Sequence, residues 1–352
     1  ISLVSDWYID QMKREAYLSS PLPISWQPKD YVYGTNEVIS VRDVQKTPLD
    51  VKTAFRIALD PEIKIDGENV IPSKQLFIPV DKNDVLSSGT LDSTRIDEVV
   101  PQIMFDLSSK SRLTKSELMV IEMLNENKWK RPVYFAVTVG DDYYLGLNDY
   151  FELTGLAYQV MPVSTGGKGA GVNTKEMYEN MMHKFRWGNV ADPKVYLDEN
   201  TLRMCRTHRM MFSQLVGALI QENDTVRAKK ALDFLVDASD GRRNVEIDFF
   251  GGEPLMNFDV VKETVAYGRG LEDKTGKRFH FTITTNGTLL DSEKIDFINR
   301  NMDNVVISID GRRAVHDAMR RDRAGRGSYD RILPLAKELV AGRNGKSYFI
   351  RG

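Results

Sequence analysis

Residues 244–352 alternate between short segments in which every second residue is apolar and longer segments whose apolar residues have helical spacing. The short segments, at residues 244–250, 278–285, 304–310 and 347–350, predict strands. The longer ones, at residues 260–270, 291–299 and 329–341, predict helices, the first of them ended by Gly268 and Gly270. Strands that alternate with helices in this way favour a parallel sheet or part of a (β/α) barrel.

The first three of these strands each have one polar face. Glu246 and Asp248 alternate with apolar residues in the first strand, and Ser308 and Asp310 close the third. Parallel strands that are buried on both faces are normally apolar throughout. In a barrel, the polar face would line the interior, and functional residues would gather at the carboxyl ends of the strands. An antiparallel sheet with one solvated face is the alternative, and the intervening helices disfavour it.

Residues 1–240 follow a different pattern. A short helix begins near Asp6, short strands are expected at residues 31–33, 70–71 and 77–80, and Thr114 and Glu117 form a capping box before another helix. Two amphipathic helices, at residues 201–221 and 225–238, predict a helical hairpin of tetratricopeptide-like length. We therefore expect an α+β domain at residues 1–199, a hairpin at 200–240 and a partial (β/α) barrel at 241–352.

Charge also separates the two parts of the chain. The 352 residues carry 48 Lys and Arg against 50 Asp and Glu, but residues 1–241 have a net charge of −6 and residues 242–352 a net charge of +4. The near-zero balance predicts no nucleic-acid partner. No apolar run reaches the roughly 18 residues of a membrane span, and no signal peptide opens the chain. These absences predict a cytoplasmic location.

Glycine-containing loops follow the three strands. They contain Gly251-Gly252-Glu253-Pro254, Asn286-Gly287 and Asp310-Gly311. Glycine lets the backbone approach a ligand closely, and a carboxylate such as Glu253 could accept hydrogen bonds from a ligand ammonium group. Ordinary turn chemistry also explains the last two loops, because Asn-Gly and Asp-Gly are common turn pairs. The first loop is the more specific signal.

Residues 228–352 resemble part of a radical S-adenosylmethionine enzyme, and within that superfamily the maturases that install thioether cross-links in a cysteine-rich peptide of the six-cysteines-in-forty-five type. The stretches that carry the resemblance are residues 243–256 (RNVEIDFFGGEPLM), 281–287 (FTITTNG), 302–311 (MDNVVISIDG) and 315–320 (VHDAMR).

This resemblance implies a cofactor site. It implies that Gly251, Gly252 and Glu253 hold the methionyl ammonium group of S-adenosylmethionine. It places Thr285, Asn286, Ser308 and Asp310 at strand ends that face the cofactor, and Arg320 near the cofactor carboxylate. In the complete family, a reduced 4Fe–4S cluster cleaves the cofactor to a radical that abstracts hydrogen from the substrate peptide. No catalytic residue can be assigned from the sequence.

The cluster ligands of that family are absent from this sequence. The family needs three cysteines in a Cys-x₃-Cys-x₂-Cys loop, and the chain has one cysteine, Cys205. One thiol cannot hold a site-differentiated cluster. Cys205 and His208 share a helical face, but no third ligand stands at metal-binding spacing, so we predict no metal site.

Residues 1–233 resemble another family, the soluble C-terminal region of bacterial multi-spanning membrane proteins of the protein O-mannosyltransferase type. The stretches that carry this resemblance are residues 6–13 (DWYIDQMK), 21–25 (PLPIS), 131–139 (RPVYFAVTV) and 150–158 (YFELTGLAY). It implies a membrane-adjacent domain on the extracytoplasmic side. The two resemblances meet near residues 228–234, which indicates a chimera.

Three interpretations follow from the sequence. In the first, the second part is the S-adenosylmethionine-binding fragment of a thioether-forming maturase that acts on a cysteine-rich peptide and is inactive as it stands. In the second, the chain is the accessory domain of a glycosyltransferase-like membrane protein with a non-functional tail. In the third, it is a non-functional fusion that folds only in part. The open sheet edges of a half barrel predict a homo-oligomer.

Overall fold

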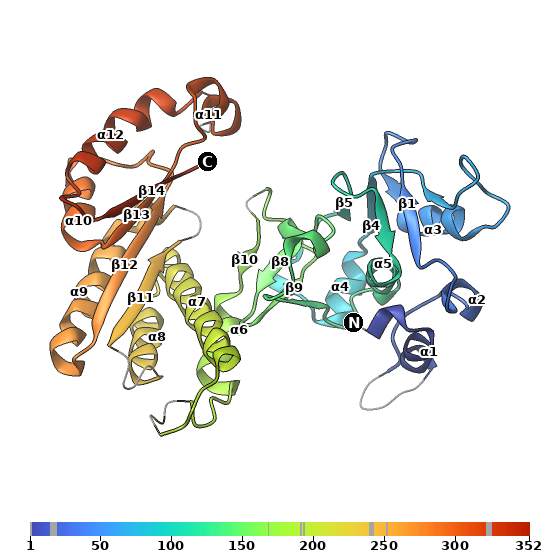
Figure 1. Cartoon of the computed structure of the whole chain (residues 1–352), viewed down its shortest axis with the longest axis horizontal. Coiled ribbons are helices and arrows are strands. Elements are labelled where there is room, and N and C mark those ends of the chain that lie inside the picture. The colour runs from blue at the N-terminus through green and yellow to red at the C-terminus, as the bar shows by residue number, and fades with distance from the viewer. Residues whose placement is uncertain are drawn as a thin grey trace. The chain divides into compact units, whose positions relative to one another are not determined.

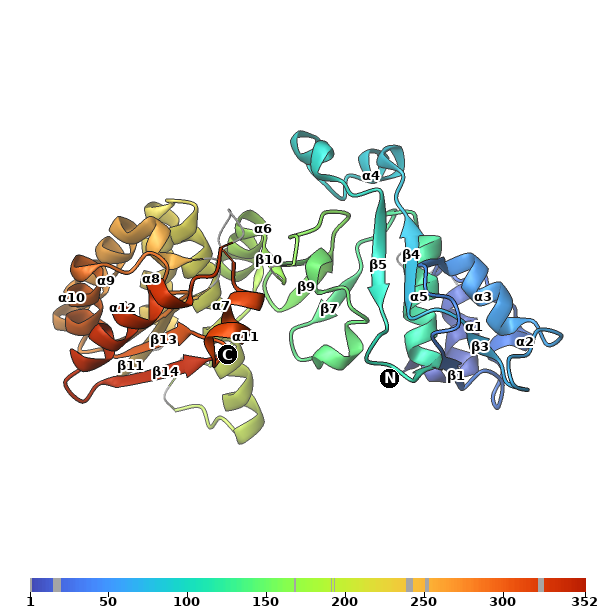
Figure 2. The same ribbon diagram turned by 90° about the horizontal axis from the view of Figure 1, so that it is seen from above.

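A computed structural model gives the fold (Figures 1 and 2). It describes residues 2–14, 20–167, 169–190, 192, 194–238, 243–250, 253–321 and 326–352. The chain divides into two compact units, one formed by residues 1–153 and 157–171 and the other by residues 154–156 and 172–352. The domain boundaries expected from the sequence stay predictions.

The first unit is built from short strands and helices in several small sheets. One sheet has the strand order β3-β1-β6, another β2-β4-β5, and a third β10-β8-β9-β7, whose β10 stands at the division between the units. Its helices are α1 (Asp6–Arg14), α2 (Pro28–Tyr31), α3 (Val51–Leu59), α4 (Lys82–Ser88) and α5 (Lys115–Asn127). Its strands are β1 (Val38–Val41), β2 (Leu49–Asp50), β3 (Val70–Ile71), β4 (Gln75–Pro79), β5 (Gln102–Asp106), β6 (Arg112–Thr114), β7 (Tyr134–Ala136), β8 (Phe151–Leu153), β9 (Ala157–Val160) and β10 (Gly171–Val172).

Local sequence signals explain two helix starts in this unit. The carboxylate of Glu117 accepts hydrogen bonds from the backbone N–H and the hydroxyl of Thr114, both at 2.8 Å, so the capping box before α5 is confirmed. The strand expected at residues 31–33 is wrong, because residues 28–31 form α2. Pro28 suits the first position of a helix, and the carboxylate of Asp30 accepts a hydrogen bond from the N–H of Gln27.

The second unit contains a four-stranded sheet and the helical pair before it. The sheet has the order β11-β12-β13-β14, and all three pairings are parallel. Its strands are β11 (Asn244–Phe249), β12 (Arg278–Thr285), β13 (Asn304–Ser308) and β14 (Ser347–Arg351). Its helices are α6 (Thr174–Glu179), α7 (Glu199–Gln221), α8 (Thr225–Ala238), α9 (Phe258–Thr275), α10 (Ser292–Asn301), α11 (Arg313–Met319) and α12 (Tyr329–Ala341). The parallel pairings contradict the antiparallel alternative.

Helices cover one face of this sheet. Figures 1 and 2 show α9, α10 and α12 along the same side of the strands. The side chains that point to this side are buried, and they include Val245, Ile247, Phe249, Phe279, Phe281, Ile283, Val305 and Ile307. The alternate residues of β11, β12 and β13 are half-buried or exposed, and all five residues of β14 are exposed. The predicted polar face is therefore the one that helices α9, α10 and α12 leave uncovered.

Helix α9 continues past the two glycines that were expected to end it. It ends instead at Gly276, which has a φ of +67°. A Cβ atom on Gly268 would lie 2.7 Å from Cζ of Phe281, so the helix packs closely on β12 because this residue has no side chain. Gly268 is thus needed for packing and does not end the helix.

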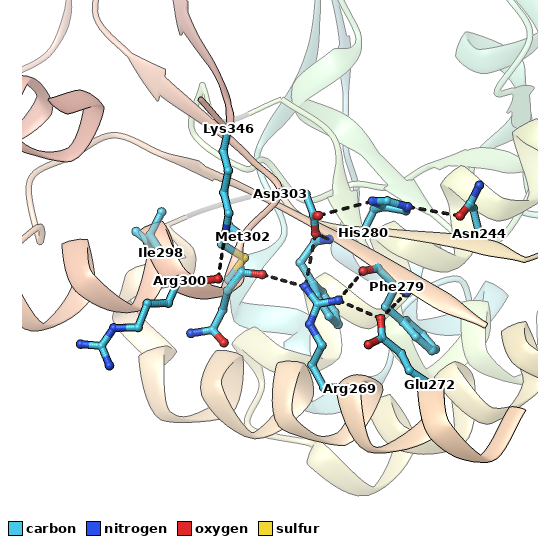
Figure 3. Close-up of polar contacts among 12 residues, drawn as sticks. Asn244, Arg269, Glu272, Phe279, His280, Ile298, Arg300, Met302, Asp303 and Lys346 are labelled. Atoms are coloured by element: carbon cyan, nitrogen blue, oxygen red, sulfur yellow. Dashed lines mark hydrogen bonds and ion pairs between the residues drawn. The ribbon is translucent and has the colours of Figure 1, made fainter. Parts of the chain in front are cut away.

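Charged side chains join the amino ends of the strands (Figure 3). Arg269 on α9 donates hydrogen bonds to the carbonyl oxygens of Phe279 (2.7 Å) and Asn301 (3.0 Å) and forms ion pairs with Glu272 and Asp303. Lys346 donates to the carbonyl oxygens of Asn299 and Arg300, at the carboxyl end of α10, where a cation also opposes the negative end of the helix dipole. The hydrogen bonds and ion pairs at the amino ends of the strands therefore have a structural role.

We expect Gly268→Ala to lower the free energy of unfolding by about 1–3 kcal/mol, because the new methyl group overpacks the contact with Phe281. Gly270→Ala is the matched control, since no atom lies within 4 Å of its added Cβ. We expect it to raise stability by up to about 1 kcal/mol through helix propensity. Hydrogen exchange of β12 amides in increasing urea measures both changes. Equal effects of the two substitutions would contradict the packing role of Gly268.

Candidate functional site

The loops at the carboxyl ends of β11, β12 and β13 contain most of the residues predicted to bind the cofactor. Because the strands are parallel, these ends lie at the same edge of the sheet. Gly251 and Gly252 lie outside the described residues. Five of the remaining predicted residues lie in two hydrogen-bonded groups, which we call the Glu253 cluster (Glu253, Thr285, Asn286) and the Asp310 cluster (Asp310 and Arg320, with His316 and Ser328).

The Glu253 cluster joins the loop after β11 to the end of β12. The carboxylate of Glu253 accepts hydrogen bonds from the hydroxyl of Thr285 (2.8 Å) and from the backbone N–H groups of Asn286 (2.7 Å) and Leu255 (3.2 Å). Glu253 and Thr285 are buried. Burial raises the pKa of Glu253, and the three donors act in the opposite direction. Glu253 therefore fixes two strand ends to each other.

The Asp310 cluster lies after β13. The guanidinium of Arg320 binds the carboxylate of Asp310 through two nitrogens, with distances of 2.8 and 3.0 Å. This bidentate contact lowers the pKa of Asp310. Arg320 follows α11, a short helix that the sequence did not predict.

His316 is a buried residue of this cluster to which the sequence gave no role. Its Nδ1 accepts a hydrogen bond from the N–H of Asp310 (3.2 Å), so Nε2 carries the proton and donates to the hydroxyl of Ser328 (2.9 Å). The Ser328 hydroxyl in turn donates to the carbonyl of Arg320 (3.0 Å). This chain of hydrogen bonds holds Asp310 and Arg320 in place. The four-residue spacing of His316 and Arg320 was its one signal in the sequence.

Ser308 stands apart from both groups. It ends β13 opposite Arg351 of β14, and its hydroxyl has no hydrogen-bond partner within the described part of the chain. The structure thus brings Glu253, Thr285 and Asn286 together, and Asp310 and Arg320 together. No hydrogen bond or ion pair between described residues joins the two groups. The roles assigned to all these residues stay predictions.

The described residues show no metal centre and no membrane span. No group of three or more His, Cys, Asp or Glu side chains in the described ranges could hold a metal ion. Cys205 lies in α7 as a free thiol. No described helix has the length and apolar character that are needed to cross a bilayer.

Family comparisons divide the chain in two. The family model of TMEM260-associated domain 2 matches residues 2–180, which is just over half of the chain, so the chain belongs to this family. Residues 221–347 match the family model of the Radical SAM superfamily. The second match confirms that this part of the chain carries a partial radical SAM (β/α) fold.

Two curated relatives match short stretches. The chain is 30% identical over 102 residues to a cysteine-type anaerobic sulfatase-maturating enzyme of Clostridium novyi, covering 29% of this chain and 27% of that enzyme. It is 31% identical over 108 residues to an uncharacterized protein of Methanocaldococcus jannaschii, covering 31% of this chain and 36% of the relative. The chain therefore spans about a third of the length of these relatives.

Solved structures of one maturase are similar over part of the chain. The structure described as native anSMEcpe with bound AdoMet is 19% identical and covers 40% of this chain and 33% of its own, with a TM-score of 0.29. The hexahistidine-tagged form with bound AdoMet is 20% identical, covers 39% of this chain and 33% of its own, and gives a TM-score of 0.31. TM-scores this low add nothing to the family match.

The residues at the sheet edge are chemically compatible with the amino-acid part of S-adenosylmethionine, the cofactor of the Radical SAM superfamily. The carboxylate of Glu253 has about four acceptor positions, and hydrogen-bond donors occupy three of them. Nη1 of Arg320 has no partner among the described residues, and the Arg320 side chain is 38% exposed. An acceptor and a donor therefore remain for an ammonium group and a carboxylate. The 4Fe–4S cluster does not fit, because the sequence offers one thiol.

We expect Thr285→Val to lower the free energy of unfolding by about 1–3 kcal/mol, since it removes a donor from the buried carboxylate of Glu253. Thr282→Val is the matched control. Thr282 lies on the same strand with its side chain on the opposite, half-buried face and makes no side-chain hydrogen bond to another described residue. We expect this control to change stability by less than about 0.5 kcal/mol. Urea titrations monitored through the hydrogen exchange of β12 provide the comparison, and equal losses in the two variants would contradict the role of Thr285.

Proposed function

We propose that the second unit binds S-adenosylmethionine at the carboxyl ends of β11, β12 and β13 and is the cofactor-binding part of a maturase that forms thioether cross-links in a cysteine-rich peptide. The observation that carries this proposal is the presence of both the Glu253 and the Asp310 clusters at the carboxyl ends of the strands, within the stretch that matches the Radical SAM superfamily. The Clostridium novyi relative is a maturating enzyme, which supports a role in modifying a polypeptide.

In this proposal the two clusters have different tasks. Glu253 keeps the loop after β11 against the end of β12, and its remaining acceptor position would be available to the ammonium group of the cofactor. Arg320, which is held by Asp310 and His316, offers its free Nη1 to the cofactor carboxylate. S-adenosylmethionine supplies the reactive group of the maturases, and the 352 residues supply one thiol, Cys205, where the cluster that would activate the cofactor needs three. The chain by itself is therefore proposed to bind the cofactor without cleaving it.

The match of residues 2–180 to TMEM260-associated domain 2 supports a second candidate function. In this alternative, the first unit is an accessory domain of a protein O-mannosyltransferase-like membrane protein, and the second unit binds no cofactor. The two proposals differ in one measurable property, which is the affinity of the chain for S-adenosylmethionine.

We expect S-adenosylmethionine to stabilise the chain, by about 2.7 kcal/mol at a concentration 100 times the dissociation constant. Calorimetric titration gives the affinity. Arg320→Gln should weaken it about 10- to 100-fold, because one charged hydrogen bond is lost. Arg300→Gln, which removes the same charge from an exposed residue at the carboxyl end of α10, should leave the affinity unchanged. If the wild-type chain shows neither heat of binding nor stabilisation, the first proposal is wrong and the second gains support.

A further inference from the structure

A cavity of about 680 Å³ lies on the uncovered face of the four-stranded sheet. Asp248 and Phe250 line it from β11 and the following loop, Thr284 from β12, and Phe349 and Arg351 from β14, while Ser213 of α7 closes one side. Its volume lies in the range of sites that bind small molecules or short peptide segments. None of these residues belongs to the Glu253 or Asp310 cluster.

Asp248 is the unusual residue of this cavity. Its Oδ1 is buried and has no hydrogen-bond partner among the described residues. The hydroxyl of Ser213 accepts a hydrogen bond from the backbone N–H of Asp248 at 2.7 Å and does not contact the carboxylate. Burial raises the pKa of Asp248, and no charged group among the described residues offsets it. A buried carboxylate oxygen without a partner is costly, and an acidic side chain in a cavity whose pKa is raised by burial is a candidate for a functional site.

The other charged residue of the cavity is Arg351, which lies on the strand at the opposite edge of the sheet. Asp248 is on β11 and Arg351 on β14, three strand spacings or about 14 Å apart across the sheet. The register places Asp248 level with Ser347, so Arg351 also lies four residues, or about 13 Å, further along the strand direction. The two residues form no ion pair. The surface between them is mostly apolar and includes Val306, Phe349 and Ile350. The two offsets together give a span of about 20 Å, which corresponds to about six residues of extended peptide.

We propose that this sheet-face cavity binds an extended peptide segment, with a lysine or arginine side chain of the peptide on Asp248 and an acidic side chain about six residues away on Arg351. A peptide cation gives the buried carboxylate the partner that the chain does not provide, and the apolar middle of the segment covers Phe349 and its neighbours. This assignment rests on the proposed function in so far as the segment belongs to the maturase substrate.

The probes are two acetylated and amidated heptapeptides, lysyl-alanyl-leucyl-alanyl-leucyl-alanyl-glutamate and its analogue with norleucine in place of lysine. They are titrated calorimetrically into the full chain. We expect the lysine peptide to bind about 10-fold or more tightly than the norleucine peptide. Asp248→Asn, which is isosteric and removes the buried charge, should abolish this preference. Glu246→Gln is the matched control, since Glu246 is exposed on the same strand outside the cavity, and it should keep the preference.

Three results would overturn the proposal: no binding of either peptide, equal binding of both by the wild-type chain, or a lysine preference that survives in Asp248→Asn. Arg351→Gln adds a second readout, because it should abolish the preference for glutamate over glutamine at the seventh position. Titration of the wild-type chain with S-adenosylmethionine separates the cavity assignment from the proposed function. A lysine preference without cofactor binding contradicts the proposed function and keeps the cavity assignment, whereas cofactor binding without a lysine preference does the reverse.

Discussion

The second unit depends on one constraint, which is that helices α9, α10 and α12 cover only one face of its parallel sheet. Phe279, Phe281 and Ile283 fill the contact with these helices, and close packing there requires a residue without a side chain at Gly268. The opposite face is then free to carry polar side chains, since they are not forced into an apolar layer. Parallel pairing brings the carboxyl ends of the strands to one edge. Both the candidate cofactor site and the cavity beside it are consequences of this arrangement.

The two ends of the sheet are used differently. At the amino ends, Arg269 and Lys346 bind backbone carbonyl oxygens and fix helices to strands. At the carboxyl ends, the charged groups Glu253 and Asp310 are also bonded, but each cluster keeps a group that can accept or donate further hydrogen bonds. Such a division between a structural end and a functional end is typical of (β/α) barrels.

Periodicity predicted much of this fold. The limits of β12 and α12 and the helical pair α7 and α8 follow from alternation and helical spacing, and the start of α10 follows from its capping residue Asp291. Periodicity failed where tertiary contacts determine the local structure. Gly268 reads as a helix end in sequence, yet packing on Phe281 keeps it inside α9. Tyr31 reads as part of a strand, yet Pro28 begins a helix there.

The sequence predicted which residues form the candidate site, but it did not predict the contacts between them. The sequence placed Glu253 next to a ligand, but its main contacts are with Thr285 and Asn286, because the neighbouring parallel strand ends at the same level. Alternation put Asp248 on the polar face, and only the structure shows that its carboxylate has no partner among the described residues. His316 could not be recognised, since its role depends on Ser328, twelve residues further along the chain.

The central hypothesis is that the carboxyl ends of β11, β12 and β13 hold S-adenosylmethionine. Amide hydrogen exchange of the whole chain, measured with and without saturating cofactor, is the first experiment to make, because it locates the binding site without requiring catalysis. We expect slower exchange at residues 253–256, 285–288 and 310–320, and unchanged exchange at residues 38–160. Unchanged exchange at those three segments, or slower exchange confined to other residues, would contradict it.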